Sequence, residues 1–257
     1  MSKPLVSIVI PTFNHGPFIP AAVKSALSQT YSNIEIIIVD DGSTDNTREI
    51  LKRYPVTYVY QEHSGISRAM NTGIKLSRGE FYVCMGADDE LDPRYLELCL
   101  KRALQDSEIG FVWTGAQEFG DAHEVRIPRV LHHRFSMYRG FDGQVGAALV
   151  RRKAYDDAGG YDETLPRAED WDFFIRVCKR GWKAKQVFQP VYLYRIHAKR
   201  TTKVFQKYNL SQKYPIMKLY IPLSRAFDAV VMFMTDPRQL KKRLLNRVRR
   251  FADRLYA

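Results

Sequence analysis

Short apolar runs alternate with helix-like segments along the first hundred residues of the chain. The runs have the length and the apolar or alternating pattern of β-strands, and they lie at 5–10, 34–39, 56–61 and 81–86. The segments between and after them are predicted to be helices: 19–27, a helix capped by Ser43 or Thr44, 65–77, and a helix from Pro93 to about Asp106. Strands separated by helices need crossover connections, which favours a mainly parallel sheet with helices on both faces.

The pattern changes after residue 106. Strand-like runs at 110–120, 124–127 and 146–152 follow one another without long helical segments between them. A helix at 169–180 then precedes a last strand at 186–194. This half is predicted to extend the same sheet with antiparallel strands, so the fold class is α/β with antiparallel additions.

Pairs of acidic residues follow two of the predicted strands. Asp40 and Asp41 end the second strand, and Asp88 and Asp89 follow the fourth. Two carboxylates about 4 Å apart repel by about 4 kcal/mol at an effective dielectric constant near 20, unless a cation lies between them. The carboxyl ends of parallel strands form the ligand-binding crevice of an open α/β sheet. Each pair alone is also typical of a capping turn or an exposed loop; the two together favour a cation-binding crevice.

Two common ways of holding a nucleotide are excluded by the glycine pattern. The first strand is followed by "PTFNHGPF", which has one glycine and no Gly-x-Gly-x-x-Gly motif, and no P-loop motif occurs in the chain. A bound diphosphate would therefore be held through a divalent cation on the carboxylates, which is how magnesium is usually bound together with substrate phosphates.

The composition is that of an ordinary globular protein, with 45% hydrophobic and 26% charged residues. The three cysteines form no Cys-x-x-Cys pair, which suits a reducing compartment. The N-terminal apolar run is too short for a signal peptide, and no stretch approaches the ~20 apolar residues of a membrane-spanning helix. We therefore expect a cytoplasmic protein.

The net charge of +12 is concentrated at the C-terminal end. Residues 199–257 contain 15 Lys and Arg and three Asp and Glu, whereas the rest of the chain is neutral. The segment 201–257 is predicted to be a basic helical tail, with Asp236 as N-cap and Pro237 in its first turn. Its apolar stripe consists of Leu240, Leu244, Leu245, Val248, Phe251 and Leu255. Such a helix fits an anionic membrane surface, here the inner face of the cell membrane. It fits packing on its own domain or on a second copy in a homodimer equally well, and we do not expect nucleic acid as a partner.

Three segments carry a resemblance to a known family. They are "VSIVIPTFNHGPFIPAAVKSALSQTYSNIEIIIVDDGSTDNT", "GISRAMNTGIKLSRGEFYVCMGADDELDP" and "RAEDWDFFIRVCKRGW", and together they resemble the inverting family-two glycosyltransferases. The resemblance covers roughly residues 5–200 and implies the Rossmann-like nucleotide-diphospho-sugar transferase fold of type A. It also implies a catalytic domain over 1–200, with a nucleotide-binding half at 1–106 and an acceptor-binding half at 107–200.

The resemblance also implies roles for individual residues on the donor side. The residues it assigns to nucleotide binding are Pro11, Thr12, Phe13, Asp40, Asp41, Arg68 and Asp88. Among these, Phe13 is expected near the base, Arg68 at the base or diphosphate, and Asp88 at the ribose or sugar. Gly86 stands where many family members have a further acid, so one acidic contact is missing.

The metal ligands and the general base are implied in the same way. Asp89 is expected to bind a divalent metal, Mn²⁺ or Mg²⁺, with His197 as a further metal ligand or diphosphate contact. The resemblance selects Asp170 as the general base that deprotonates the acceptor hydroxyl. Glu169 and Trp171 are expected to support the acceptor side of the site.

The activity that the resemblance implies is metal-dependent, inverting sugar transfer. The donor would be a UDP-, GDP- or dTDP-sugar and the acceptor a hydroxyl of a glycan or a lipid-linked molecule, in surface polysaccharide biosynthesis. Two alternatives remain open at this point, a transferase that uses polyprenyl phosphate as acceptor and a non-catalytic nucleotide-binding scaffold.

Overall fold

A nine-stranded mixed sheet organises the residues that the computed structural model describes, which are 3–126, 147–165 and 168–198. All of these residues belong to one compact unit. Along the sheet the strand order is β3-β2-β1-β4-β8-β6-β9-β5, and β7 pairs with β6. The strands are β1 (Val6–Thr12), β2 (Ile34–Asp41), β3 (Thr57–Gln61), β4 (Phe81–Cys84), β5 (Glu90–Leu91), β6 (Ile109–Gly120), β7 (Val125–Arg126), β8 (Leu149–Arg151) and β9 (Lys183–Ile196). The helices are α1 (Ile19–Leu27), α2 (Thr47–Leu51), α3 (Ile66–Leu76), α4 (Tyr95–Ala103), α6 (Arg152–Ala158) and α7 (Glu169–Lys179).

The first four long strands form the parallel half of the sheet. β1 lies between β2 and β4 and is parallel to both, with Val9 opposite Ile37 on one side and Cys84 on the other. β3 adds to β2 in parallel. The carboxyl ends of β1, β2 and β4 therefore lie at one edge of the sheet, as the alternating strand and helix pattern predicted.

Antiparallel pairing begins at β8, which lies between β4 and β6 and is antiparallel to both. β6 and β9 form a long parallel pair interrupted by bulges, while the short strands β5 and β7 are antiparallel to β9 and β6. The predicted α/β fold with antiparallel additions in the second half is confirmed.

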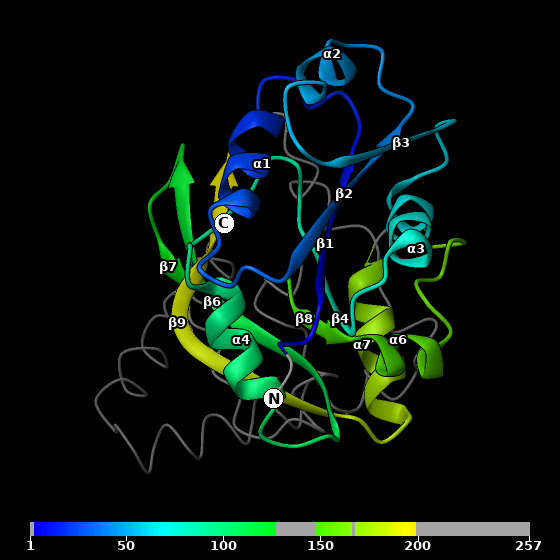
Figure 1. Cartoon of the computed structure of the whole chain (residues 1–257), viewed down its shortest axis with the longest axis vertical. Helices are drawn as coiled ribbons and strands as arrows, with labels where there is room; N and C mark the ends of the chain where they lie inside the picture. The colour runs from blue at the N-terminus through cyan, green and yellow to red at the C-terminus, as the bar shows by residue number, and fades with distance from the viewer. Residues whose placement is uncertain (1–2, 127–146, 166–167, 199–257) are drawn as a thin grey trace, which may run out of the picture. The chain divides into compact units, whose positions relative to one another are not determined.

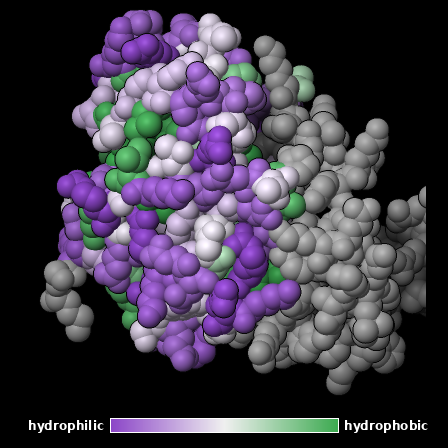
Figure 2. Space-filling model, turned by 90° about the vertical axis from the view of Figure 1, so that its right-hand side faces the viewer, coloured by the Kyte–Doolittle hydropathy of each residue, from purple (hydrophilic) through white to green (hydrophobic). Residues whose placement is uncertain are grey.

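Alternating side chains of the central strands pack against helices on both faces of the sheet. In β2, Ile36 and Ile38 join the core formed with α1 and α4, whereas Ile37 and Val39 pack with Ala69 of α3. Figure 1 shows the same division, with α1 and α4 on one side of the strands and α3, α6 and α7 on the other. The described part of the face that carries α3, α6 and α7 is largely hydrophilic, with hydrophobic residues in small groups (Figure 2).

The predicted N-cap of the second helix is wrong. α2 begins at Thr47 with Asn46 in the N-cap position, not at Ser43 or Thr44. The backbone N–H groups of Ser43 and Thr44 donate to side chains outside the helix, those of Asp40 and Asn14. Ser43 and Thr44 therefore lie in the turn before α2, where their backbone N–H groups are already hydrogen-bonded.

Two elements were not predicted at all, β5 and α6. β5 is a two-residue strand directly after the acidic pair, and it exists because Glu90 and Leu91 pair with β9. α6 follows β8 without a loop, so its first residues read as the end of the strand. The predicted tail at 201–257 lies outside the described residues, and so does Ile127, the last residue of the strand predicted at 124–127. Within the described ranges, no helix combines the length and the apolar content needed to cross a membrane.

Candidate functional site

The acidic pair that ends β2 is buried and orders the loops around it. Asp40 is 1% exposed; its Oδ1 accepts from the backbone N–H of Ser43 at 2.8 Å and its Oδ2 from the Tyr58 hydroxyl at 2.8 Å. Burial, and then the bond to Asp40, raises the pKa of Tyr58, so this hydroxyl stays a donor. Asp40 thus joins β3 to the turn that precedes α2.

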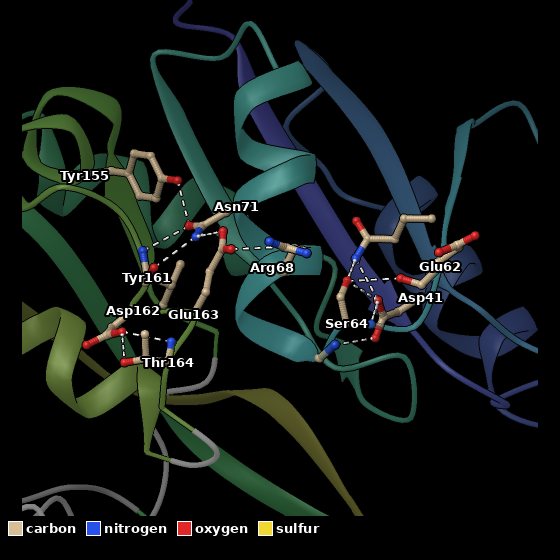
Figure 3. A network of polar contacts seen from close by, with 12 residues as sticks. Asp41, Glu62, Ser64, Arg68, Asn71, Tyr155, Tyr161, Asp162, Glu163 and Thr164 are labelled. Carbon is tan, nitrogen blue, oxygen red and sulfur yellow. Dashed lines mark hydrogen bonds and ion pairs between the residues drawn. The ribbon is translucent and has the colours of Figure 1, made fainter.

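Asp41 is 3% exposed and accepts hydrogen bonds from the loop that leads into α3. Its Oδ1 accepts from Gln61 Nε2 at 2.6 Å and from the backbone N–H of Ser64 at 3.0 Å, while its Oδ2 accepts from the backbone N–H of Gly65 at 2.9 Å (Figure 3). His63 Nδ1 lies 2.9 Å from the same Oδ2. A carboxylate has about four lone-pair sites, so the chain itself fills those of Asp41.

A flat aromatic pair lies beside Asp41. The rings of Phe13 and His63 stack with centroids 4.1 Å apart and an interplanar angle of 25°. Phe13 is 39% exposed, so part of its ring is accessible to solvent. The preceding Thr12 is buried, and its Oγ1 has no hydrogen-bond partner among the described residues, while Pro11 is half-buried at the end of β1. Three of the predicted nucleotide-binding residues therefore lie together at this strand end.

The second acidic pair is divided between two environments. Asp88 Oδ2 lies 3.0 Å from His197 Nε2, and both side chains are about 15% exposed. The ring of His197 packs against Phe18 at 4.6 Å. His15 lies close enough for Asp88 and His197 to act on it; burial lowers the pKa of His15, and His197 lowers it further, against the opposing effect of Asp88. The loops after β1 and β4 and the end of β9 therefore meet around Asp88.

Asp89 faces the protein interior instead. It is 3% exposed, and it accepts from the backbone N–H of Arg195 at 2.9 Å and from the Tyr192 hydroxyl. His197, predicted as a metal ligand together with Asp89, contacts Asp88. Asp89 instead fastens the acidic loop to β9.

Gly86 explains how the two carboxylates approach each other. A Cβ atom at this position would lie 2.8 Å from Asp88 Oδ1 and 2.8 Å from Asp89 Oδ2. Any larger residue would displace one of the two acids. A third acid at position 86 would therefore need the space that the carboxylates of Asp88 and Asp89 occupy.

The donor set around Asp88 fits a divalent cation in its chemistry and spacing. Carboxylate oxygens are the ligands that Mg²⁺ and Mn²⁺ prefer, and imidazole also binds first-row metals. Asp88 Oδ2 and His197 Nε2 are hydrogen-bonded at 3.0 Å. Two ligands at right angles around a cation, each at about 2.1 Å, would lie about 3.0 Å apart as well, so a cation could replace this hydrogen bond with little movement. Among the described residues no group of three or more His, Cys, Asp or Glu side chains is positioned as a complete metal site. Asp88 and His197 would supply two ligands.

Next to this pair lies an open cavity of about 540 Å³. Its lining includes Asn14, Phe18, Asp45 and His197. Asn14 has a positive φ of 56°, and its side-chain Oδ1 accepts from the backbone N–H groups of Thr44 and Asp45. The cavity wall is thus built by the loops that follow β1 and β2.

Asp170 lies in the first turn of α7, after Ala168 in the left-handed conformation (φ 59°). Its Oδ1 accepts from the backbone N–H of Trp171 at 2.7 Å. That bond lowers the pKa of Asp170, but burial raises it by more, so the carboxyl group is a stronger base than an ordinary aspartate. Glu169 and Trp171, expected on the acceptor side, are both half-buried in the same turn.

Tyr161 connects Asp170 to the strand that leads to the acidic loop. Burial raises the pKa of Tyr161, and both Cys84 at the end of β4 and Asp170 are near enough to raise it further. The ring of Tyr161 packs on Phe173 of α7 with centroids 4.5 Å apart. Asp170 is therefore linked through one aromatic residue to β4, after which Asp88 and Asp89 follow.

Arg68 forms an ion pair with Glu163. Its Nε lies 3.0 Å from Glu163 Oε2, and the two side chains are 59% and 34% exposed (Figure 3). Glu163 was not a predicted site residue, and neither were Tyr161, His63 or Tyr192. Nothing in the sequence indicated them, because each is defined by a contact with a segment far away in the chain.

Comparisons with known proteins identify similar sequences and structures. The sequence model described as "Glycosyl transferase family 2" matches residues 7–159, and "Glycosyltransferase like family 2" matches 129–229. A chondroitin synthase of Escherichia coli is 29% identical over 197 residues, which are 69% of this chain and 27% of that protein. The uncharacterized glycosyltransferase EpsJ of Bacillus subtilis is 29% identical over 220 residues, 78% of this chain and 64% of that one. The chain thus spans about a quarter of the length of the E. coli chondroitin synthase.

Two solved structures share the fold at low sequence identity. S. aureus TarS 1-349 in complex with UDP-GlcNAc superposes with a TM-score of 0.65 and 17% identity, over 89% of this chain and 66% of that one. The mannosyltransferase PcManGT from Pyrobaculum calidifontis, in complex with GDP-Man and Mn²⁺, gives 0.60 and 18%, over 96% of this chain and 80% of that one. These likenesses establish the fold.

Proposed function

The chain belongs to glycosyl transferase family 2, and on that premise we propose that it transfers a sugar from a nucleotide-diphosphate donor to a hydroxyl group of a glycan or lipid-linked acceptor, with inversion at the anomeric carbon. Related chains include chondroitin synthases, which supports a place in the biosynthesis of surface polysaccharides. The domain boundaries stay as predicted, with a catalytic part at 1–200.

The donor would lie across the carboxyl ends of β1, β2 and β4. Stacking on aromatic rings binds a nucleobase through its flat face, and the ring pair of Phe13 and His63 offers such a surface. Asp41 would act mainly by holding the loop that carries His63, since its own oxygens already accept from that loop. Two structures with the same fold contain UDP-GlcNAc and GDP-Man, so both nucleotides belong in a first screen.

A divalent cation would be held by Asp88 and His197, with Asp89 fastening the acidic loop from behind. When bound, such a cation neutralises the charge that develops on the departing diphosphate. The PcManGT complex contains Mn²⁺, which makes manganese the first metal to test. Arg68 would reach a donor only by leaving Glu163, and we retain its predicted contact with the base or diphosphate as a proposal.

Asp170 would act as the general base. The acceptor oxygen attacks the anomeric carbon while the bond from that carbon to the diphosphate oxygen breaks with its electron pair, and the acceptor proton passes to the Asp170 carboxylate. A single displacement of this kind inverts the anomeric centre and needs no enzyme nucleophile. The observation that carries the proposal is the half-buried carboxyl group of Asp170 in the first turn of α7, whose pKa is raised and which lies near Tyr161.

A donor screen with matched variants tests this function. UDP-, GDP- and dTDP-sugars are incubated with the protein and Mn²⁺, and release of the nucleoside diphosphate is measured. We expect one donor to be turned over, and Asp170→Asn to lower kcat by about 10²–10⁴-fold while donor binding is kept. Asp88→Asn should weaken donor binding in the presence of Mn²⁺.

Asp157→Asn is the matched control, since Asp157 lies exposed on α6, where it accepts from Trp182 Nε1. It should leave turnover unchanged. Full activity of Asp170→Asn, or a product that keeps the anomeric configuration of the donor by NMR, would contradict the proposed mechanism. Failure to bind any donor would favour the scaffold alternative.

A further inference from the structure

We propose that Asn71 of α3 is a positioning residue that holds the segment carrying the general base against the donor half of the site. The inference rests on the proposed function, because it gives Asn71 a role in placing Asp170. Asn71 touches neither acidic pair, and its part is to join two segments that lie about 90 residues apart in the chain.

Every hydrogen-bonding group of the Asn71 amide is used. Its Nδ2 donates to the backbone carbonyl of Tyr161 and to Glu163 Oε1, both at 2.9 Å. Its Oδ1 accepts from the Tyr155 hydroxyl at 2.8 Å and from the backbone N–H of Tyr161 at 2.9 Å. An amide has two donors and two acceptor sites, and Asn71 is 5% exposed. Figure 3 shows the side chain at the centre of this group, with the partners converging on it from the opposite segment.

The bond pair to Tyr161 is a backbone clamp. Asn71 binds both the N–H and the C=O of one residue, which is how a neighbouring β-strand would fix it. The chain reaches this position through Gly159 and Gly160, whose φ angles are 79° and 74°. A Cβ atom at Gly160 would lie 3.1 Å from Asn71 Oδ1 and 2.9 Å from the Tyr155 hydroxyl. Only glycine combines the left-handed conformation with this close approach.

The clamped residue carries the contact to α7. The Tyr161 ring packs on Phe173, which is fully buried, and Asp170 lies near enough to Tyr161 to affect its pKa. Asp170 stands three residues before Phe173, about one helical turn away. A displacement of Tyr161 would therefore move the first turn of α7 and its carboxylate.

On the other side, Asn71 is fixed to the donor half. A Cβ atom at Gly73 would lie 2.4 Å from a methyl group of Val9 in β1 and 3.0 Å from one of Val39 in β2. α3 therefore packs directly on the strands whose ends carry the donor-side residues. The path from the donor strands to the general base runs through α3, Asn71, Tyr161 and α7.

Glu163 completes the outer part of this connection. The hydrogen bond from Asn71, followed by the bond from Arg68, lowers the pKa of Glu163. Because Arg68 and Glu163 are both partly exposed, solvent screens their ion pair. The buried amide, rather than the exposed ion pair, is expected to hold the segment.

Steady-state kinetics of two Asn71 variants test the inference. Asn71→Asp keeps the shape but places an acceptor against the Tyr161 carbonyl and Glu163, and Asn71→Ala removes the clamp. We expect kcat to fall by about 10–100-fold in both, because a misplacement near 1 Å can cost about 10²-fold in rate. The KM for the donor and its dissociation constant should stay within about twofold, since no donor contact is removed.

Two controls separate positioning from a general loss of structure. Asn33→Asp makes the same change at an exposed asparagine, whose Nδ2 donates to the Lys3 carbonyl, and should leave kcat unchanged. Donor-binding stoichiometry from calorimetry gives the active fraction, so kcat is compared per folded site. Tyr155→Phe removes a single hydrogen bond to Asn71 and carries the test if the Asn71 variants fail to fold; it should lower kcat by a few-fold.

Wild-type kcat per folded site in Asn71→Ala, or an unchanged kcat in Tyr155→Phe where the Asn71 variants do not fold, would overturn the positioning role. The positioning role would also be overturned if only the active fraction fell while kcat per folded site stayed at the wild-type value. A KM that rises as much as kcat falls would overturn it too. Asp170→Asn is assayed alongside. If that variant keeps full activity, the proposed function fails whatever Asn71 does; if it is inactive and Asn71→Ala is not, only the positioning role fails.

Discussion

The surroundings of Asp170 favour its proposed role as a base but lower the stability of the fold. Burial raises the pKa of its carboxyl group, because a charge is poorly solvated in the interior. A general base benefits from this shift, since its proton affinity then lies closer to that of the acceptor at working pH. For the same reason the ionised carboxyl group destabilises the folded state, because water solvates it better in the unfolded chain.

We expect Asp170→Asn to raise the melting temperature near neutral pH while it abolishes transfer. A carboxyl whose pKa is raised on folding binds its proton more tightly in the folded state, so stability falls as pH rises from the ordinary pKa through the raised one. The variant lacks this loss and should melt at a higher temperature than the wild type near neutral pH.

Thermal melts of both proteins across acidic to neutral pH check this expectation. The difference should shrink as pH falls toward the ordinary aspartate pKa, because both side chains are then neutral. The exposed Asp157→Asn variant serves as the control and should show no such trend. A variant that melts lower than the wild type at neutral pH would show that Asp170 is stabilised by partners that outweigh its burial.

The acidic residues of the site could be predicted as chemical groups but not as contacts. Paired aspartates at two strand ends indicated a crevice, and the structure places both pairs at the carboxyl edge of the parallel strands. That Asp88 rather than Asp89 meets His197 depends on the direction of each side chain in one turn. Periodicity along the chain carries no information on such directions, and Asn71 is defined wholly by them.

At the level of elements, α7 is held by an aromatic contact near its beginning and by polar contacts near its end. Tyr161 packs near its beginning, and Arg176 anchors its last turns by donating to the Ala158 carbonyl at the end of α6. The Nε of Arg176 also lies 2.8 Å from Asp172 Oδ2, and Asp172 is fully buried. The helix that carries the general base thus contains a buried ion pair.

Breaking this ion pair from one side should destabilise the fold strongly. Arg176→Met removes the guanidinium group that lies 2.8 Å from the buried carboxylate of Asp172, and removing one partner of a buried pair typically costs about 3–5 kcal/mol. The double variant Asp172→Asn with Arg176→Met should recover most of the loss, because no charge is then left buried. Urea unfolding gives the three free energies. Lys52→Met breaks an exposed pair with Glu49 and should change nothing measurable; an equally small effect of Arg176→Met would contradict the argument.

The strongly periodic elements were predictable because local pattern and tertiary packing agree in them. α1 has the predicted bounds, and β2 extends the predicted run by two residues into the acidic pair. β5 could not be found, since two residues have no period and this strand depends on β9, which lies about a hundred residues away. α6 was missed because β8 runs into it without the loop residues that would mark a boundary.

At the scale of the whole molecule, the two halves of the sheet have different proposed roles. In the proposed function the parallel strands would supply the crevice for the donor, and β6, β8 and β9 continue the sheet toward the part expected to bind the acceptor. The antiparallel placement of β8 between β4 and β6 makes one continuous sheet of both. Residues of the two halves therefore keep a fixed relation through the sheet as well as through Asn71.

The net positive charge of the chain lies outside the described residues of the proposed catalytic part. Residues 1–198 are neutral overall, and the net charge of +12 comes from residues 199–257. These basic residues flank an apolar stripe in the predicted helix, the combination typical of helices that bind at an anionic membrane surface. A lipid-linked acceptor would be met at such a surface. Attachment of the full chain to anionic membranes is therefore our hypothesis for this segment.

Flotation of the full chain with liposomes tests the hypothesis. We expect recovery with phosphatidylserine-containing liposomes and little with neutral ones, because each Lys or Arg near an anionic surface contributes about 1 kcal/mol. Replacing Lys241, Lys242 and Arg243 with Glu should abolish flotation, and added salt should weaken it through screening. Equal absence from both liposome types would leave packing on the chain's own domain or on a second copy as the role of the basic helix. Equal recovery with both types would mean that apolar contact, and not charge, brings the protein to the membrane.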